Sequence, residues 1–280
     1  MSKIESGLKK LGSLLVNVII SAFSLFCLFP VVWMLYSSLK EESEFKRNLL
    51  SLPTQLHFEN YQTAVKTGRM DTAFVNSVLV SVTAVVVLLL IAFLAGTIFG
   101  RYVFKGKKLL YTMFLMGMLI PVHSLLVPVF IELKTFSLNN NRFVLALIYA
   151  AFGLPKAIFL MTTYASTIPR ELEEAAIIDG GNTHDVFFRI FLPISKPILS
   201  TITILSFLDA WNEFPFSLVL MGKPELKTLP IALTYFTGQY SVDYTPMMAG
   251  LAIATLPVVI VYFIFHKKIM EGMVAGAVKG

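Results

Sequence analysis

The chain has 280 residues, of which 56% are hydrophobic and only 14% are charged, and its mean hydropathy is +0.75. Soluble domains contain about 25% charged residues. The composition therefore indicates a membrane protein and leaves no room for an ordinary soluble catalytic domain. The net charge of +6 is explained by basic loops between apolar runs, so no nucleic-acid partner is expected.

Six apolar runs have about the 20 residues that a helix needs to cross a lipid bilayer. The first run is too long for the apolar part of a cleaved signal peptide, so we expect it to remain as a helix, and it contains the single cysteine, Cys27. We predict one all-α membrane domain over residues 1–280 with six transmembrane helices. Their expected positions are about 12–37, 73–100, 109–131, 143–165, 198–221 and 246–266.

The distribution of basic residues predicts the orientation in the membrane. The segment RYVFKGKK, residues 101–108, has four positive side chains and no acidic one. Loops rich in Lys and Arg face the cytoplasm, so with six spans both chain ends are expected to be cytoplasmic. The polar segment 38–72 then lies outside, where the residues from Asn60 onward are expected to form a short helix on the membrane surface.

A polar segment between the fourth and fifth spans, residues 166–197, begins with a predicted short helix. Pro169 suits the first turn of a helix, and the three glutamates that follow it lie near the positive end of the helix dipole. The helix is expected to run to about Asp179, because Gly180 and Gly181 are natural terminators.

A second short helix is predicted directly after this turn. Asn182 or Thr183 can cap it, and Pro193 and Pro197 are expected to break the chain ahead of the fifth span. Helices this short are marginal alone in water. The first one is too acidic for the membrane surface, so docking into a protein groove is expected, with a solvated connecting loop as the alternative. The apolar stripe of the second helix consists of Phe187, Ile190 and Phe191.

The stretch EAAIIDGGNTHDVFFRIFLP, residues 174–193, resembles the signature of bacterial ABC importer membrane subunits. That signature is Glu-Ala-Ala, three residues, Gly, nine residues, Ile, one residue and Leu-Pro. The segments DAWNEFPFSLVL, TLPIAL and MVAGAVKG extend the resemblance over nearly the whole chain, to the smaller partner of the maltose-type carbohydrate permeases. The residues that it assigns to coupling with the ATPase are Glu174, Ala175, Ala176, Asp179, Gly180, Ile190, Leu192 and Pro193.

The resemblance implies the fold of ABC type I importer permeases, with the two short helices inserted into a cleft of the ATP-binding subunit. Glu174 would meet a basic residue there, and Gly180 would make the turn. Relatives often carry alanine at the next position, so we expect Gly181 to loosen this turn. The cytoplasmic tail, residues 267–280, would reach the ATPase dimer through Gly276, Ala277, Val278, Lys279 and Gly280.

The resemblance also implies the partners: a second permease chain in a heterodimer, two ATP-binding subunits, an extracytoplasmic solute-binding protein and an oligosaccharide substrate, in the lipid of a bacterial cytoplasmic membrane. The chain itself is expected to be non-catalytic. Its nearest phosphate-loop candidate, GRYVFKGKK, has the wrong glycine spacing and lacks the Ser or Thr after the lysine. We expect no cofactor and no metal, because His-Glu-x-x-His, Gly-x-Ser-x-Gly and Cys-x-x-Cys are all missing from the sequence.

Polar residues within the fifth span are candidates for a substrate pathway. Charged groups inside a span usually face a cavity or a partner helix. Asp209 and Glu213 are four residues apart and share one helix face, with Trp211 and Asn212 nearby. Carboxylates, an amide and an aromatic ring suit a path for sugars. The alternative is interhelical hydrogen bonding that positions the fifth span against the partner subunit.

The third and fourth spans add further polar candidates. Pro121 and Pro128 flank His123 and Ser124, and proline inside a span permits a bend. The two polar side chains either contact substrate or make structural hydrogen bonds. Lys156 in the fourth span is expected to snorkel or to pair with a carboxylate.

Two other classes of function are alternatives to an importer subunit. A stand-alone secondary transporter often shows inverted repeats with paired broken helices, but the sequence has no second copy of segment 169–197 or of the proline-containing third span. An intramembrane enzyme using His123 with Asp209 or Glu213 would need a nucleophile or ligand spacing that the sequence lacks.

Overall fold

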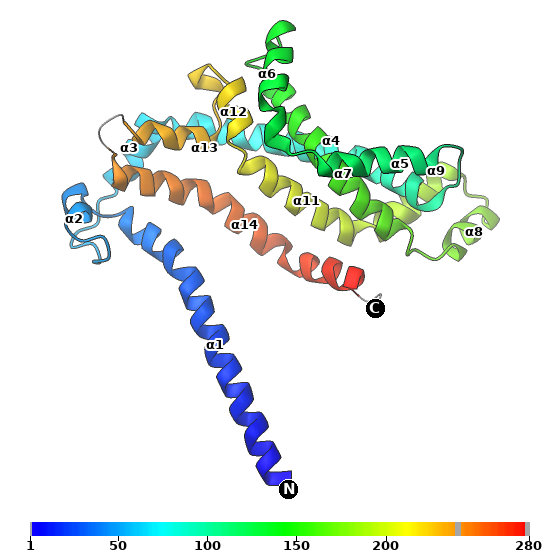
Figure 1. Cartoon of the computed structure of the whole chain (residues 1–280), viewed down its shortest axis with the longest axis horizontal. Coiled ribbons are helices and arrows are strands. Elements are labelled where there is room, and N and C mark those ends of the chain that lie inside the picture. The colour runs from blue at the N-terminus through cyan, green and yellow to red at the C-terminus, as the bar shows by residue number, and fades with distance from the viewer. Residues whose placement is uncertain (1, 239–241, 278–280) are drawn as a thin grey trace. The chain divides into compact units, whose positions relative to one another are not determined.

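The computed structural model describes residues 2–238 and 242–277. These residues form helices and turns, apart from one isolated β-bridge. The helices are labelled in Figure 1. The chain divides into two compact units, which are Met1–Met70 with Leu233–Thr255, and Asp71–Ala232 with Leu256–Gly280.

The first unit contains the long helix α1 and the polar segment that follows it. Between Gly12 and Ser37, the apolar residues of α1 are almost all exposed, which suits a helix surrounded by lipid. The short helix expected from Asn60 is confirmed as α3. The helices of this unit are α1 (Ser2–Ser37), α2 (Glu42–Arg47), α3 (Glu59–Gly68), η5 (Leu233–Phe236) and the first part of α14 (Tyr244–Ala277).

The turn after α1 is held by a buried lysine and an amide. Lys40 is fully buried, and its Nζ donates to the carbonyls of Asn48 at 3.1 Å and Leu49 at 3.2 Å. Asn60 donates to the carbonyls of Ser38 and Lys40. Because buried polar groups are costly unless they are hydrogen-bonded, these bonds fix α2 and α3 to the end of α1.

The second unit contains the helices that position the candidate sites. Helix α7 packs against both α5 and α11, and the three are seen together in Figure 1. Its helices are α4 (Met70–Arg101), α5 (Lys107–Met116), η1 (Gly117–Leu119), η2 (Val122–Leu125), α6 (Leu126–Thr135), α7 (Arg142–Ala165), α8 (Glu171–Ile178), α9 (Thr183–Asp185), the π-helix η3 (Val186–Phe191), α10 (Leu192–Ile194), α11 (Lys196–Trp211), α12 (Pro215–Leu220), η4 (Pro224–Leu226), α13 (Leu229–Ala232) and the rest of α14.

Within the described residues, four helices are long and apolar enough to cross a membrane, and there are up to six spans if each of two bent pairs counts as one. Five of the six lie close to the predicted apolar runs. The fifth was predicted at 198–221, whereas the bent pair covers 183–211 and the chain is interrupted after Trp211, before α12. The four helices are Gly12–Ser37, Met70–Arg101, Arg142–Ala165 and Tyr244–Phe265, and the bent pairs are Lys107–Leu119 with Val122–Thr135 and Thr183–Ile194 with Lys196–Trp211.

The third predicted span, 109–131, contains a bend of 90° rather than one straight helix. Ile120 and Pro121 both have extended backbone, with ψ angles of 121° and 108°. The residue before a proline is disfavoured in a helix, so the helix ends there and a new one starts. The bend expected from the prolines is therefore confirmed at Pro121, while Pro128 lies in the first turn of α6, where a proline is tolerated.

The prediction that Pro193 breaks the chain is wrong. The helical run continues from Thr183 to Ile194, and the turn of 69° comes at Ser195. In the π-helix η3, the N–H of Leu192 bonds to the carbonyl of Phe187, five residues earlier. This wider turn lets the helix pass Pro193, which has no N–H and would crowd a carbonyl four residues before it.

Two glycines bring α4 and α7 close together near the end of α4. A Cβ added at Gly96 would lie 2.5 Å from Cβ of Met161, and one added at Gly100 would lie 2.7 Å from Cβ of Ala165. Real Cβ atoms do not approach so closely, so only glycine permits this contact. Small residues four apart are typical of tightly packed membrane helices. The close approach sets the ends of α4 and α7 side by side, directly before α8.

Candidate functional site

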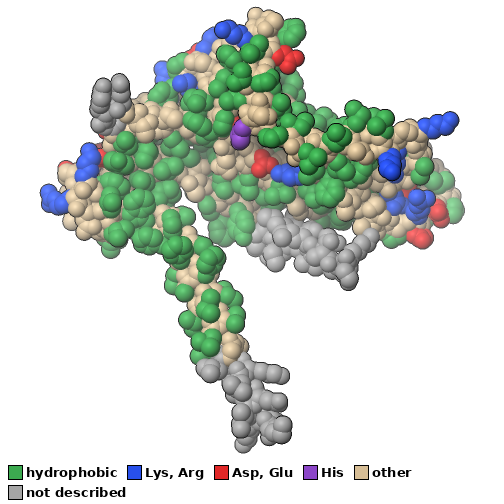
Figure 2. Space-filling view, in the orientation of Figure 1, with side chains coloured by type: hydrophobic (Ala, Val, Ile, Leu, Met, Phe, Trp, Pro, Cys, Tyr) green, Lys and Arg blue, Asp and Glu red, His purple; other side chains and the backbone are tan. Residues whose placement is uncertain are grey.

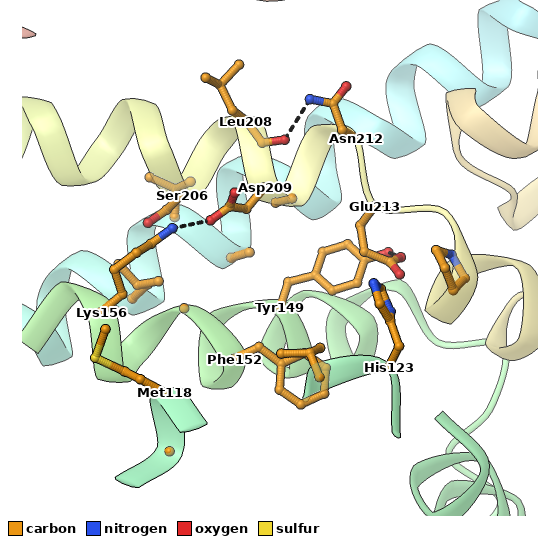
Figure 3. A pocket seen from close by; sticks show the side chains of 18 of the residues that line it. Met118, His123, Tyr149, Phe152, Lys156, Ser206, Leu208, Asp209, Asn212 and Glu213 are labelled. Atoms are coloured by element: carbon orange, nitrogen blue, oxygen red, sulfur yellow. Dashed lines mark hydrogen bonds and ion pairs between the residues drawn. The ribbon is translucent and has the colours of Figure 1, made fainter. Parts of the chain in front are cut away.

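A cavity of about 640 Å³ lies in the second unit, lined by residues of α4, α7, α11 and the segment around the bend at Pro121. Its wall combines apolar groups with a few polar side chains, as is usual for binding cavities of this size. Figure 3 shows side chains from the surrounding helices pointing toward one another, whereas Asn212 points away from them. The labelled polar residues of the wall are His123, Tyr149, Lys156, Ser206, Asp209, Asn212 and Glu213.

An ion pair joins two helices at this cavity. Nζ of Lys156 on α7 lies 2.5 Å from Oδ2 of Asp209 on α11, and the side chains are 38% and 63% exposed (Figure 3). The expectation that Lys156 pairs with a carboxylate is confirmed. Both side chains line the cavity, so a ligand in the cavity could still reach them while they are paired.

Glu213 has a structural task beside the cavity. Its carboxylate accepts from the backbone N–H of Phe216 at 2.7 Å and of Ser217 at 3.1 Å, at the N-terminus of α12. It also accepts the O–H of Tyr149. A carboxylate is favoured at a helix N-terminus, so Glu213 stabilises the start of α12 after the break that follows α11. Its bond with Tyr149 also joins this segment to α7. These hydrogen bonds join α12 and α7 within this chain, so hydrogen bonding against a partner subunit stays a prediction.

The remaining pathway candidates divide between the cavity and the interior. His123 and Asn212 line the cavity, and Asn212 also donates to the carbonyl of Leu208 at 3.0 Å. Ser124 and Trp211 are not among the lining residues. Ser124 donates to the carbonyl of Pro121 at 2.7 Å, and the ring of Trp211 is buried. The structure thus brings four of the six predicted residues together.

Replacement of Glu213 by alanine is expected to lower the stability of the protein by about 1–3 kcal/mol, because two N–H groups and the Tyr149 hydroxyl lose their acceptor. Thermal unfolding of the detergent-solubilised protein measures this loss. Glu132→Ala, which removes an exposed glutamate on α6, is the matched control and should leave the midpoint unchanged. Equal midpoints for the two variants would contradict the structural task of Glu213.

The second site is the loop between α7 and α11, and its turn is closed by a full set of backbone bonds. Gly180 has a φ of 85°. Its N–H bonds to the carbonyl of Ile177, and the N–H of Gly181 bonds to that of Ala176 at 2.8 Å. This pattern is a Schellman motif. A Cβ at Gly181 would lie 2.8 Å from the Ala176 oxygen, so the expectation that Gly181 loosens the turn is wrong: it lets the turn close.

The second helix of this loop starts with a capping box and packs inward. The side chain of Asn182 accepts from the N–H of Asp185, whose carboxylate accepts from the N–H of Asn182. Of the predicted cap residues, Asn182 is therefore the cap. Phe187 and Phe191 are buried in the core of the unit, as the predicted stripe requires, whereas Ile190 is half-buried.

Helix α8 turns most of its side chains outward. Leu172, Ile177 and Ile178 are 42%, 62% and 84% exposed, although they are apolar. Figure 2 shows charged side chains gathered around this end of the unit, while the middle of the helices is mostly apolar. Exposed apolar side chains among charges indicate a surface that meets another protein.

The residues of the Glu-Ala-Ala signature fall into an exposed and a packed set. The exposed ones are Glu174, Ala175, Asp179, Gly180 and Pro193. Three others are half-buried, namely Ala176, Ile190 and Leu192. In the predicted tail, Gly276 and Ala277 end helix α14, while Val278, Lys279 and Gly280 lie outside the described residues. The predicted cytoplasmic tail 267–280 is thus helical as far as Ala277, and its position in the cytoplasm stays a prediction.

Two contacts of these sites were not predicted as such. Tyr149 was not a candidate, because a tyrosine among apolar residues gives no signal of its own. Arg101 was counted only for its charge, yet its side chain is buried and hydrogen-bonded to Glu173 of α8. The partners in these two contacts are 72 and 64 residues apart, so no sequence motif with a fixed spacing could predict them.

Comparison with known proteins gives one consistent family. Residues 92–273 match the family described as binding-protein-dependent transport system inner membrane component. The diacetylchitobiose uptake system permease protein of Streptomyces coelicolor is 30% identical over 93% of this chain and 87% of its own. The trehalose transport system permease protein of Mycobacterium tuberculosis is 32% identical over 91% and 93%.

A similar fold is found among solved structures. The crystal structure of a bacterial ABC transporter involved in the import of the acidic polysaccharide alginate superposes with a TM-score of 0.80, at 24% identity, over 92% of this chain and 96% of the other. The all-α fold of this chain is therefore also found in that transporter. The chain belongs to the family of binding-protein-dependent transport system inner membrane components, and it is a membrane-spanning permease subunit of an ABC transporter.

Proposed function

We propose that this chain is one half of the translocation pathway of an ATP-driven oligosaccharide importer. It works as a heterodimer with a second permease chain, receives its substrate from an extracytoplasmic solute-binding protein and is driven by two ATP-binding subunits. The names of its relatives support a sugar substrate, since they include diacetylchitobiose, trehalose and arabinooligosaccharides.

The exposed face of α8 is the observation that carries the proposal. Glu174, Ala175 and Ile178 lie on the same side of the helix, and all three are exposed. A helix of eight residues is too short to be stable by itself, and its acidic first turn is unsuited to a membrane surface. We assign this face to a cleft of the ATP-binding subunit, with the alanine allowing close approach and Glu174 meeting a basic residue.

The orientation follows from the basic residues. We place α8 and the segment 101–108 in the cytoplasm, together with both chain ends. The polar segment with α2 and α3 then faces the binding protein. We place the last residues of α14 and the tail beyond Ala277 at the interface of the two ATPases, in line with the family resemblance.

We assign the cavity to the sugar. Tyr149 and Phe152 supply aromatic surface, and Asp209 and Asn212 supply hydrogen-bonding groups. Hydroxyl groups need acceptors, while the apolar face of a sugar ring packs on aromatic rings. In the proposed cycle, ATP binding closes the ATPase dimer, α8 moves with it, and the cavity switches from inward- to outward-facing as a rigid-body movement. Hydrolysis resets the cavity, and the permease itself makes and breaks no covalent bond.

Replacement of Glu174 by lysine is expected to lower co-purification of the ATP-binding subunit with the tagged permease at least about tenfold, because like charges then face each other in the docking cleft. Insertion into the membrane should be unchanged. Glu59→Lys is the matched control, since Glu59 is also an exposed first-turn glutamate of a short helix but lies in the segment assigned to the outside. Normal co-purification of the Glu174→Lys variant would contradict the proposed docking face.

A stand-alone secondary transporter is the rival function. It would use the cavity and the ion pair as an ion and substrate site, and it would have no need of an exposed α8. The family that the chain belongs to does not favour this alternative.

A further inference from the structure

Arg101, the last residue of α4, connects three elements of the second unit. Its Nε donates to Oε1 of Glu173 on α8 at 2.5 Å, and its Nη2 donates to the same oxygen. Its Nη1 donates to the carbonyls of Ala165 at 3.3 Å and Ile168 at 2.5 Å, at the end of α7. One guanidinium group thus holds the ends of two spans and the first turn of α8 together.

The arrangement is a buried one and is strongly constrained. The side chain of Arg101 is 4% exposed and that of Glu173 is 20% exposed. The ring of Phe191, in η3, lies 5.5 Å from the guanidinium carbon. A buried charge is tolerated only with a partner, and the carbonyls at a helix C-terminus carry negative partial charge. If α8 moved away from α4 and α7, Arg101 would remain buried without its carboxylate partner. The three elements are therefore expected to move together.

Few other contacts hold α8. Glu173 and Ala176 are the only residues between Glu171 and Asp179 that are not classed as exposed. Ala176 packs against the core of the unit, near the buried Phe187 and Phe191. The methyl group of Ala176 makes only weak, non-directional contacts. The ion pair between Arg101 and Glu173 has several directional hydrogen bonds and can transmit a displacement better.

Both spans that Arg101 joins to α8 also line the cavity. Helix α4 contributes Leu88 and α7 contributes Lys156. Leu88 is thirteen residues before Arg101 in one unbroken helix, a distance of about 20 Å at 1.5 Å per residue. A displacement at the α8 end of these helices therefore reaches the cavity without passing through any loop.

We propose that Arg101 is a positioning residue that locks the docking helix α8 to the ends of α4 and α7 through Glu173, so that movement imposed on α8 by the ATPase becomes movement of the two cavity-lining helices. The inference rests on the proposed function, because it takes α8 as the docking element. It adds the connection between that element and the cavity. A pair that served folding alone would leave the coupling of ATP hydrolysis to transport untouched.

The test uses the complete transporter in proteoliposomes and measures the sugar imported per ATP hydrolysed. In the double variant Arg101→Met/Glu173→Met, apolar side chains replace the pair, a change that often preserves folding. We expect normal co-purification of the ATPase, but a fall of about tenfold or more in sugar per ATP. Arg101→Lys should give an intermediate ratio, because an ammonium group cannot reach all three acceptors at once.

Arg189→Met is the matched control. Arg189 pairs with Asp185 at 3.2 Å in the same loop, but within one helix and with an 81% exposed side chain. Its loss should leave the ratio unchanged. A wild-type ratio in the double variant with intact co-purification would overturn the inference and spare the proposed function. Loss of docking by Glu174→Lys is a separate readout, so the two failures are distinguishable.

A distance measurement covers the case in which the double variant fails to assemble. Spin labels at the exposed positions 170, the cap residue of α8, and 94 on α4 report the separation of the two helices in an otherwise unchanged chain. We expect the same distance in the nucleotide-free and ATP-bound transporter. A distance that changes upon ATP binding would mean that α8 moves independently of α4, and the proposed lock would be refuted.

Discussion

Valine in place of Gly180 is expected to reduce ATP-driven uptake by about tenfold or more while leaving the chain in the membrane. The residue has a φ of 85°, which costs a β-branched side chain about 1–3 kcal/mol. The strain is relieved when the Schellman turn opens, and the angle between α8 and the capped helix after it is then lost. Uptake by the reconstituted transporter measures the effect, with the amount of membrane-inserted chain as the reference.

Gly106→Val is the control for backbone strain in general. Gly106 also has a φ of 85°, and an added Cβ meets nothing within 4 Å at either glycine. The two substitutions therefore impose similar strain at two exposed turns. Only the one at Gly180 deforms the proposed docking element. Equal loss of uptake in both variants, or near-normal uptake with valine at 180, would argue against a coupling role for this turn.

The second large effect is expected at the ion pair of the cavity. Lys156→Met leaves Asp209 as an unpaired carboxylate in the cavity wall within the membrane, and we expect uptake to fall at least about fivefold. The double variant Lys156→Met/Asp209→Leu removes both charges. It should transport better than the single variant, because no unpaired charge then faces the pathway.

Uptake assays of the two single variants, Lys156→Met and Asp209→Leu, and of the double variant complete the cycle. Lys134→Met, which removes an exposed lysine on α6 that is not among the cavity-lining residues, should behave as wild type. Additive effects of the two single substitutions would show that the pair has no joint role in the pathway.

Local features of the structure were largely predictable from sequence. The positive φ at Gly180, the cap at Asn182 and the bend at Pro121 each follow from the chemistry of one or two residues. The apolar runs located five of the six candidate spans, since bilayer thickness fixes the length of such a run, but they misplaced the bounds of the fifth.

Features that depend on distant contacts were not predictable. The helix passes Pro193 because the backbone shifts to five-residue hydrogen bonds in η3, and nothing in the local sequence announces that shift. The pairing of Arg101 with Glu173 joins residues 72 positions apart. Glu213 carries the same charge as Asp209, yet its hydrogen bonds to α12 and Tyr149 make it mainly structural.

Reconstitution of ATP-driven uptake tests the central claim most directly. Proteoliposomes contain this chain, its partner permease and the two ATP-binding subunits, and they receive the oligosaccharide that the cognate binding protein holds in calorimetry. We predict uptake that requires the binding protein and enclosed ATP, and that stops with a non-hydrolysable analogue. Uptake by this chain alone, driven by an ion gradient without the ATP-binding subunits, would contradict the account.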